Sequence, residues 1–593
     1  MDNPKIKQTA WDLGDIIAAP EGEPLKRITI ELEVVISKIE AMRPKLNEDI
    51  SSTDFNYALE LTERVTEAAN RLGAYAGLWF SEDTQNQAAL AFQGKIEQLT
   101  TEAQNRVLFL TLWWKTMPNE SADRLTASAP ENLQYYLRQQ RKEKPHVLTE
   151  HDEQIINIKN MNGSNALTTI YAMLTNKYKF NLEITSGNEN HELTRDALMT
   201  YVRNSDADLR ERAYKELYRV YAEDGMVLAQ VYKHLVQDWH EEQVKLRNYS
   251  TPIAIRNLRN NISDEVTEML LQTCRENVSI FQNWFRIKAG LLQVNKLRRY
   301  DIYAPLTIAE QRYPYVESVE LVLDTFEEFS PELASSARRV FEDNHIDSEN
   351  RIGKRGGAFC ASVAPNITPY VLLNYGESVR DVATLAHELG HAVHSMMANN
   401  HSVLNYHSTL PLAETASTFS EMLLIDKLLA NNTDTAVRRD LIANALDDNY
   451  ATIMRQAYFT LFEQQAHMMI KEHVGTDELN KVYMDNILEQ FGDSIEISEE
   501  FQWEWVSIPH IYYSPFYCYA YSFGQLLVLA LYQRYRAEGI NFIPHYLRIL
   551  SYGGSQSPEY ILNESGIDIS KPEFWQGGFD YIKEMIDELD ATT

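Results

Sequence analysis

The sequence predicts a mostly α-helical protein, long enough for more than one domain or for one large multi-helical body. Its 593 residues include only 23 glycines and 19 prolines, which favours long helices over many short strands. Near the N-terminus, apolar residues recur at the spacing of one helix face, at Ile28, Leu32, Val35, Ile36 and Ile39. A hydrophobic content of 44% is enough to form a large core.

Helical patterns and their boundaries organise the first two hundred residues. Helical periodicity extends over 24–116, and turn-forming residues interrupt it over 117–132. Thr149 stands three residues before Asp152, as an N-cap residue does at the start of a helix. We also expect a polar loop over 185–190 and a long helix capped by Ser205.

One region breaks the helical pattern. Residues 356–375 contain β-branched and aromatic side chains separated by glycines and prolines, which is typical of two short strands. An exposed strand edge here would allow an extended peptide to add to the sheet. The alternative is an ordinary hairpin packed in the core.

A metal-binding pattern follows directly, with His387, Glu388 and His391 inside the segment 381–395. Four residues make just over one helical turn, so both histidines project from the same face. Two such imidazoles can bind one zinc ion, and the glutamate can act on a metal-bound water. The alternative is a core helix with two hydrogen-bonded histidines. The apolar neighbours indicate a buried helix; they are Val382, Leu385, Ala386, Leu389 and Val393.

A catalytic zinc usually has three protein ligands and one open position. The metzincin pattern is excluded, because His394 and Met397 occupy the positions where it requires glycine and histidine. Another class of zinc peptidase takes a glutamate from a second helix. In 410–424, Glu414 and Glu421 are seven residues apart and face roughly the same way. We expect Glu414 to be the third ligand and Glu421 to orient a ligating histidine, the alternative being a solvated helix face.

An aromatic segment near the C-terminus is a second chemical candidate. Twelve residues contain His510, Tyr512, Tyr513, Tyr517, Tyr519 and Tyr521. Peptide hydrolysis at zinc develops an oxyanion on the carbonyl, to which a histidine and a tyrosine hydroxyl can donate. The alternative is a packing patch, because tyrosines also fill cores while their hydroxyls find partners.

Composition limits the partners and the compartment. The net charge of −30 favours repulsion from nucleic acid and from anionic membrane surfaces. The N-terminus has no apolar signal region, and the best apolar run, 526–532, is far too short to span a membrane. The three cysteines, Cys274, Cys360 and Cys518, cannot all pair. We therefore expect a cytoplasmic protein with neither nucleic-acid nor membrane partners.

The two candidate helices resemble those of the thimet oligopeptidase and oligoendopeptidase F family of zinc peptidases. In that family, H-E-x-G-H is followed by a helix that begins E-x-x-S. The corresponding residues here are His387, Glu388, Gly390 and His391, followed by Glu414 and Ser417. Further segments resemble oligoendopeptidase F in particular: 300–306, 353–359, 510–521 and 553–568, with a looser likeness at 145–153.

The resemblance implies a zinc-dependent oligoendopeptidase that hydrolyses internal bonds of short peptides. One Zn2+ per chain would be held by His387, His391 and Glu414, with Glu388 activating the zinc-bound water. The fold implied is mostly α, with two lobes around a deep channel and a small β-sheet near the zinc site. We place the N-terminal helical lobe at 1–200 and the catalytic zinc-peptidase domain at 201–593.

In the same family, a histidine and tyrosines of the aromatic segment face the zinc. His510 matches directly, and Tyr513 and Tyr519 are the expected tyrosines. Two alternatives to an endopeptidase stay open: a helical zinc carboxypeptidase, and a non-catalytic peptide-binding helical scaffold with a structural metal. The sequence does not determine the oligomeric state or the cleavage preference.

Overall fold

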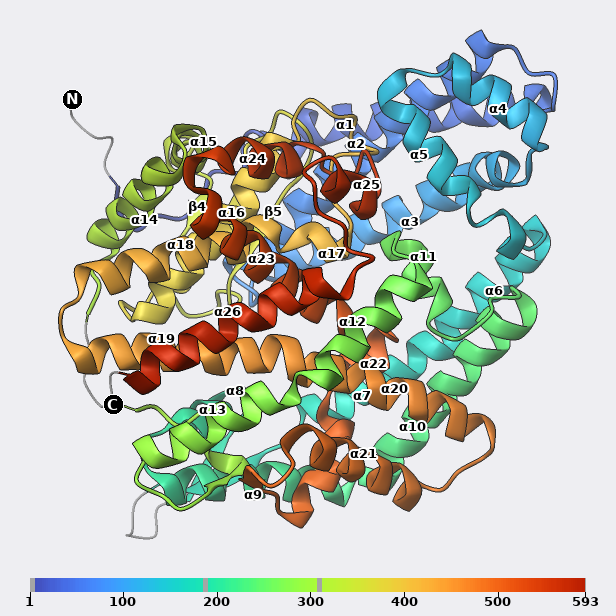
Figure 1. Cartoon of the computed structure of the whole chain (residues 1–593). Helices are drawn as coiled ribbons and strands as arrows, with labels where there is room; N and C mark the ends of the chain where they lie inside the picture. Colours follow the sequence, from blue (N-terminus) through green and yellow to red (C-terminus); the bar gives the residue numbers. More distant parts are fainter. Residues whose placement is uncertain (1–5, 185–189, 307–311, 592–593) are drawn as a thin grey trace. The chain divides into compact units, whose positions relative to one another are not determined.

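The computed structural model describes residues 6–184, 190–306 and 312–591, and these are mostly helical (Figure 1). The predicted mostly α fold class is therefore confirmed. The chain forms two compact units: unit 1 comprises Met1–Val147, Glu310–Leu428 and Arg534–Ile567, and unit 2 comprises Leu148–Ala309, Leu429–Gln533 and Asp568–Thr593. The segments of the two units alternate along the sequence. The two predicted domains and the channel stay predictions.

Unit 1 contains the N-terminal helices, a small sheet and the helix with the zinc-binding pattern. Its elements are α1 (Gly22–Met42), α2 (Ser52–Glu82), α3 (Gln87–Thr116), α4 (Asn119–Ser128), α5 (Glu131–Arg141), α14 (Tyr315–Phe329), α15 (Pro331–Glu342), β4 (Ile346–Asp347), β5 (Phe359–Ala361), β6 (Tyr370–Leu372), α16 (Val379–Met397), α17 (Leu410–Ala413), most of α18 (Thr415–Asn431), α24 (Ile543–Ser551) and α25 (Pro558–Asn563).

Unit 2 is also helical. Its elements are α6 (Glu150–Asn162), α7 (Ser164–Asn176), β1 (Phe180–Glu183), β2 (Asn190–Leu193), α8 (Arg195–Thr200), α9 (Ala207–Glu223), α10 (Gly225–Trp239), α11 (Ala254–Asn260), α12 (Asp264–Glu276), α13 (Val278–Leu291), β3 (Leu297–Arg298), α19 (Thr435–Asn449), α20 (Arg455–Lys471), α21 (Thr476–Phe491), β7 (Ile495–Glu496), α22 (Pro509–Tyr513), most of α23 (Tyr519–Glu538) and α26 (Pro572–Ala591). Two π-helical segments, His240–Leu246 and Tyr450–Met454, continue α10 and precede α20.

The helix boundaries confirm one of the two predicted N-caps and contradict the other. Thr149 caps α6 by accepting a hydrogen bond from the backbone N–H of Asp152 at 3.2 Å. The prediction of Ser205 as a cap is wrong, because the carboxylate of Asp206 accepts from the first free N–H groups of α9 instead. The turn predicted over 117–132 is wrong for most of its length, since Pro118 and Pro130 each precede a helix. The loop predicted at 185–190 lies almost wholly outside the described residues.

The strands predicted within 356–375 are present as β5 and β6. They pair antiparallel, with Phe359 opposite Leu372, and the short β4 adds to the other side of β6 in parallel. The sheet order β4-β6-β5 leaves β5 at an edge. Phe359, Tyr370 and Leu372 pack against the buried faces of α1, α2 and α3, so the sheet shares the core of the N-terminal helices.

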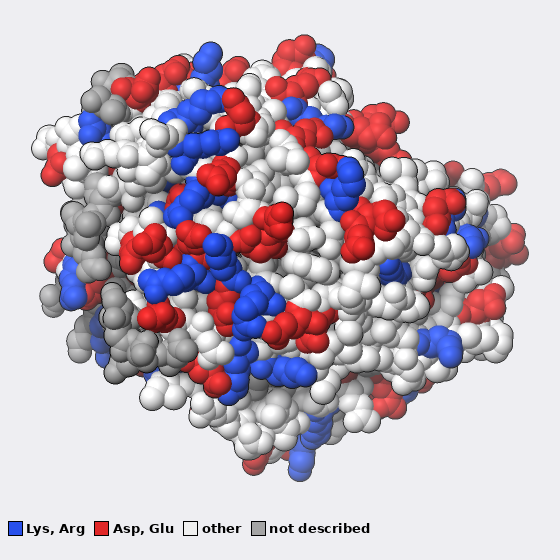
Figure 2. Space-filling view, turned by 90° about the horizontal axis from the view of Figure 1, so that it is seen from below, with Lys and Arg blue, Asp and Glu red and all other residues white. Residues whose placement is uncertain are grey.

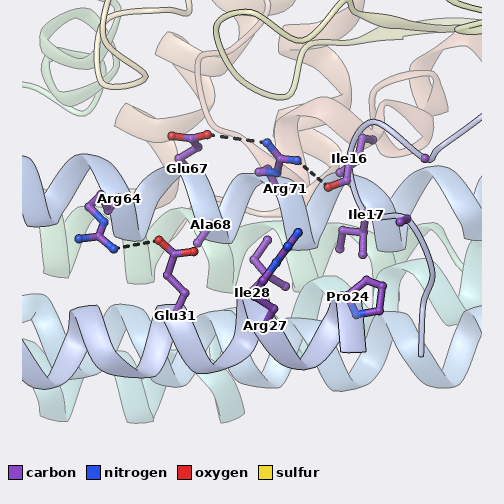
Figure 3. Close-up of a pocket in the computed structure, with 12 residues that line it drawn as sticks. Ile16, Ile17, Pro24, Arg27, Ile28, Glu31, Arg64, Glu67, Ala68 and Arg71 are labelled. Atoms are coloured by element: carbon purple, nitrogen blue, oxygen red, sulfur yellow. Dashed lines mark hydrogen bonds and ion pairs between the residues drawn. The ribbon is translucent and has the colours of Figure 1, made fainter. Parts of the chain in front are cut away.

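The surface carries charges of both signs. On the face shown in Figure 2, acidic and basic side chains lie next to one another. A pocket of about 410 Å³ between α1 and α2 is similarly balanced, because Arg64 pairs with Glu31 at 2.9 Å and Arg71 contacts Glu67 at 3.8 Å (Figure 3). Its lining includes none of the candidate site residues. None of the described helices is long and apolar enough to cross a membrane, and all three cysteines are free.

Candidate active site

Helix α16 is a buried helix with a defined start. The Ser378 side chain accepts from the backbone N–H of Asp381 at 3.2 Å, and the Asp381 carboxylate accepts from the N–H of Ser378 at 2.8 Å. This reciprocal pair is a capping box, which satisfies two otherwise free N–H groups. The helix packs against α14, α15, α24 and the strands β5 and β6. All five apolar residues predicted to be buried are buried: Val382, Leu385, Ala386, Leu389 and Val393.

Gly390 allows α16 and α18 to approach closely. A Cβ atom at this position would lie 2.6 Å from the carbonyl oxygen of Ala416 and from the Cα of Ser417. No other residue type fits that space without moving backbone. The glycine inside the H-E-x-G-H pattern therefore has a packing reason, and it brings the start of α18 beside the two histidines.

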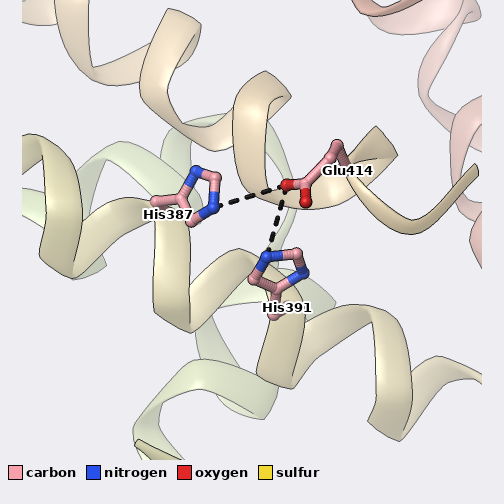
Figure 4. Close-up of side chains that lie close together, drawn as sticks. All are labelled: His387, His391 and Glu414. Carbon is pink, nitrogen blue, oxygen red and sulfur yellow. Dashed lines mark ion pairs between the residues drawn. The ribbon is translucent and has the colours of Figure 1, made fainter. Parts of the chain in front are cut away.

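His387, His391 and Glu414 come together at this contact (Figure 4). The Nε2 atoms of the two histidines lie 3.4 and 3.3 Å from Oε2 of Glu414, in the same order. The side chains keep 27%, 24% and 32% of their surface exposed, so solvent reaches the cluster. Glu414 lies at the junction between α17 and α18 rather than within one continuous helix.

Two neighbours hold these groups in place. Glu421, on α18, forms a hydrogen bond through Oε1 with Nδ1 of His387. The Ser417 hydroxyl donates to Oε2 of Glu414 at 2.7 Å. Because Nδ1 of His387 is engaged by Glu421, its Nε2 is the nitrogen that points to Glu414. The seven-residue spacing of the two glutamates thus places them on opposite sides of one imidazole.

Residues 200–581 match the profile described as Peptidase family M3. The chain belongs to peptidase family M3. Residues 113–180 match a second profile, described as Oligopeptidase F. Membership of this family makes the chain a metallopeptidase that cleaves peptides, so the predicted enzyme class and the family resemblance are both confirmed.

Relatives of this M3 chain match nearly its whole length. It is 28% identical to a protein of Borreliella burgdorferi named oligoendopeptidase F homolog, over 98% of this chain and 97% of that protein. It is also 28% identical to oligopeptidase PepF of Bacillus subtilis, over 99% of this chain and 88% of that protein. The crystal structure of oligoendopeptidase-F from Enterococcus faecium has the same fold, with a TM-score of 0.74 at 22% identity, covering 96% of this chain and 98% of that one.

Within the cluster of His387, His391 and Glu414, the histidine and carboxylate side chains favour one another's charged forms. Burial disfavours a charged His387, but the hydrogen bond and charge of Glu421, with Glu414 and Glu388, outweigh burial and raise its pKa to about 9. Burial likewise disfavours a charged Glu414, but the two histidines and Ser417 outweigh it and lower its pKa to about 2. Glu414 is therefore ionised at neutral pH, which is the form that binds a metal.

Glu388 lies among the same residues but is buried, with 6% of its surface exposed. Burial is the main cause of its raised pKa, and Glu414 and Glu421 act in the same direction while the histidines oppose it. A carboxyl with a raised pKa suits a group that accepts a proton and then returns it.

His394 is buried one turn beyond His391. Burial is the main reason that its pKa is lowered to about 4, so the ring is neutral near pH 7. It forms a hydrogen bond with the backbone of Ala413, the residue before Glu414. His394 is therefore a packed, hydrogen-bonded neighbour, and its hydrogen bond supports the turn that presents Glu414.

The edge strand β5 lies next to α16. Just beyond its end, Ser362 forms a hydrogen bond with Ser395 of α16 at 2.5 Å. Cys360, in the middle of β5, lies close enough to Glu388 for that carboxylate to add to the effect of burial in raising the pKa of the thiol. One side of β5 is thus fixed to β6, and in the described part of the chain no strand pairs with its other side.

The aromatic segment belongs to unit 2, where His510 lies on the short helix α22. Its ring is parallel to that of Tyr517 at 5.9 Å and meets Tyr521 edge-on at 5.8 Å. The Tyr521 hydroxyl is 3.5 Å from Nε2 of His510, a long contact. Burial, with the charge of Arg455, lowers the pKa of His510, so the imidazole is neutral at neutral pH.

The two tyrosines expected from the sequence have other neighbours. Tyr519 is fully buried, and its hydroxyl accepts a hydrogen bond from Asn260 at 2.8 Å. Tyr513 keeps 52% of its surface exposed and packs edge-on against Tyr171. Tyr517 and Tyr521 are the ring neighbours of His510. Crowding of tyrosines was visible in the sequence, but their register depends on a turn between two helices that no periodicity indicates.

Proposed function

We propose that this M3 peptidase is a zinc-dependent oligoendopeptidase that hydrolyses internal bonds of short peptides. The observation that carries the proposal is the convergence of His387, His391 and Glu414, with Glu388 beside them. Two imidazole nitrogens and one carboxylate oxygen are the donor set of many catalytic zinc sites. The hydrogen bond between Nδ1 of His387 and Oε1 of Glu421 leaves Nε2 of His387 available as a ligand, which further supports zinc at these residues.

When bound, zinc supplies a Lewis acid that polarises the scissile carbonyl and lowers the pKa of a water molecule. Glu388 accepts the proton of the attacking water and delivers it to the leaving amine. Its raised pKa supports this double role. Glu421 keeps His387 oriented, and Ser417 keeps Glu414 oriented.

His510 is proposed to donate a hydrogen bond to the oxyanion that develops on the carbonyl, together with a tyrosine. The neutral state of its imidazole and the family resemblance support this role. Tyr513 and Tyr519 stay predictions from the sequence, whereas the ring contacts of His510 favour Tyr517 or Tyr521.

The proposed substrates are oligopeptides in extended conformation. The unpaired side of β5 offers backbone groups with which a peptide could pair as an added strand. A cytoplasmic location and the lack of nucleic-acid and membrane partners stay predictions from the composition.

The test uses two versions of a peptide of about ten residues, one blocked at both ends and one with a free C-terminus. Cleavage is followed by mass spectrometry. We expect zinc-dependent cuts at internal bonds, which chelation abolishes. A carboxypeptidase would instead act only on the version with a free C-terminus. Zinc binding without cleavage of either peptide would indicate a binding scaffold. Placing the same sequence in a surface loop of a stable folded protein should prevent cleavage, and equal cleavage of the two would argue against an enclosed site.

A further inference from the structure

The turn between α22 and α23 holds a strained residue. Phe516 has φ 57°, in the left-handed region, although it is a bulky residue with 1% of its surface exposed. Such a conformation is unfavourable for a large side chain and persists only where surrounding contacts hold it. This turn connects His510 on α22 to Tyr517 and to Tyr521 on α23. Its conformation therefore sets how these three rings meet.

Two helices hold the turn through hydrogen bonds. From α20, Oε1 of Glu463 accepts from the backbone N–H of Phe516 at 2.8 Å. From α11, Arg256 donates through Nη2 to the Ser514 hydroxyl at 2.8 Å and through Nε to the Pro515 carbonyl at 3.2 Å. Glu463, Arg256 and the turn all belong to unit 2. The turn is thus held at three consecutive residues, through the side chain of Ser514 and the backbone of Pro515 and Phe516.

Glu463 is an unusual group for such a contact, because its side chain is fully buried. Its second oxygen, both ring nitrogens of His467 and the hydroxyl of Tyr232 are buried and have no hydrogen-bond partner within the described residues. Glu463 and His467 are four residues apart on α20 and so share one face. The ring of His467 in turn packs on that of Phe516 at 4.6 Å. A buried carboxyl costs free energy unless a partner compensates it, and the backbone N–H of Phe516 is one partner that Glu463 has.

Both groups are neutral at neutral pH. Burial raises the pKa of Glu463 to about 8, against the opposing effects of the Phe516 N–H and Arg256. Burial is also the main reason that the pKa of His467 is lowered to about 3. A protonated carboxyl still offers one oxygen as an acceptor to Phe516. Glutamine offers the same acceptor with nearly the same shape, so it is a close substitute for this glutamate.

We propose that Glu463 is a positioning residue for catalysis, which fixes the turn at Phe516 and thereby sets His510 against Tyr517 and Tyr521. This inference rests on the proposed function of His510 in stabilising the oxyanion. Glu463 lies outside the metal cluster, and it would hold the proposed hydrogen-bond donors to the oxyanion in place before the substrate binds.

The test compares Glu463→Leu, which removes the acceptor, with Glu463→Gln, which keeps it. On a zinc-loaded enzyme and a peptide substrate, Glu463→Leu should lower kcat about 10²-fold with little change in KM, as a small misplacement of catalytic groups does. Glu463→Gln should restore kcat to within a few-fold of the wild type. Wild-type kcat in the leucine variant, or equal loss in both variants, would overturn the proposal.

A control separates positioning from loss of stability. Ile470 is buried on the same helix, and Ile470→Val removes one methylene without touching the turn. It should lower Tm while leaving kcat unchanged. If the leucine variant fails to fold, Arg256→Met loosens the same turn from α11. It should lower kcat with KM and zinc content kept, and unchanged kcat in it would count against the proposal.

Hydrogen exchange at 510–521 gives a readout that needs neither substrate nor metal. Glu463→Leu should speed exchange in this segment, whereas Glu463→Gln and Ile470→Val should not. Unaltered exchange in the leucine variant would overturn the role of Glu463 even if the wild type is an active peptidase. If the wild type cleaves no peptide and the leucine variant still exchanges faster than the wild type, the structural role of Glu463 is retained and the proposed function is removed.

Discussion

Nδ1 of His387 is hydrogen-bonded to Oε1 of Glu421, across the contact between α16 and α18. This bond selects one nitrogen of the ring and fixes the orientation of the other. It depends on the close approach of the helices at Gly390, so a packing feature of the backbone determines the direction of a metal ligand.

Removing Glu421 should weaken metal binding without abolishing it. Glu421→Ala frees the His387 ring, and the loss of such an outer partner typically costs about 10–100-fold in metal affinity. Glu414→Ala should cost considerably more, because it removes a ligand atom itself. Competition with a chelator measures both variants. If Glu421→Ala loses the metal while Glu414→Ala retains it, the assignment of the two glutamates is reversed.

Replacing Glu388 should separate metal binding from turnover. Glu388→Gln keeps the shape of the side chain but cannot accept the proton, so kcat should fall about 10²–10⁴-fold or more while zinc stays bound. Metal content and kcat are measured on the same preparation. Near-normal turnover by the zinc-loaded variant would remove Glu388 from the mechanism.

Gly390→Ala should disturb the metal site from within the core. The added methyl group meets backbone at 2.6 Å, so α16 and α18 must separate. Overpacking of this kind typically costs about 1–3 kcal/mol of stability, and here zinc affinity should fall with it. The matched control is Gly73→Ala on α2, where nothing lies within 4 Å and the change should stabilise by about 0.5–1 kcal/mol. Equal zinc affinity in the two variants would mean that the helix contact does not set the ligand geometry.

The sequence predicts the parts of this site that depend on helical spacing alone. His387 and His391 are one turn apart, and the apolar residues around them repeat with the same period, so both the helix and its buried face follow from local pattern. Glu414 can be chosen as a candidate ligand from the sequence, but helical spacing does not predict that it lies at a junction between two helices.

Contacts between distant residues explain what the sequence does not predict. The two-residue strand β4 forms only because β6 is beside it. Asp206 rather than Ser205 caps α9, because both residues can cap and only the geometry of the preceding loop decides. The register of the tyrosines depends on the left-handed Phe516, which Glu463 and Arg256 hold from other helices.

Tyrosine substitutions should identify the donor that acts with His510. Phe in place of Tyr517 or Tyr521 removes a hydroxyl and keeps the ring, and we expect at least one of these variants to lose about 10²–10³-fold in kcat with KM unchanged. Tyr519→Phe should instead lower stability by about 1–3 kcal/mol, because it leaves the buried Asn260 without its acceptor. Steady-state kinetics and thermal unfolding on the same samples distinguish these effects. Loss of kcat confined to Tyr513→Phe or Tyr519→Phe would support the tyrosines predicted from the sequence instead.

The buried carboxyl of Glu463 should make stability depend on pH. Its pKa in the folded protein, about 8, lies above the ordinary value of 4.5 expected when unfolded. The folded state therefore holds an extra proton between these values, so this contribution to stability is complete below about pH 4.5 and is lost as pH rises through 8. The titratable groups facing it are His467 on the same helix, and Tyr232, Cys518 and Arg256 from neighbouring segments.

Glu463→Gln removes this titration and leaves those neighbours in place. The difference in unfolding free energy, variant minus wild type, should therefore grow with pH by about 1 kcal/mol per unit between pH 5 and 8 and then level off. Denaturant unfolding of both proteins at several pH values measures it. The titrations of His467 and of other groups away from the site largely cancel in the difference. A difference that stays constant over this range would mean that Glu463 is ionised in the folded protein, and that glutamine is not the equivalent of its native form.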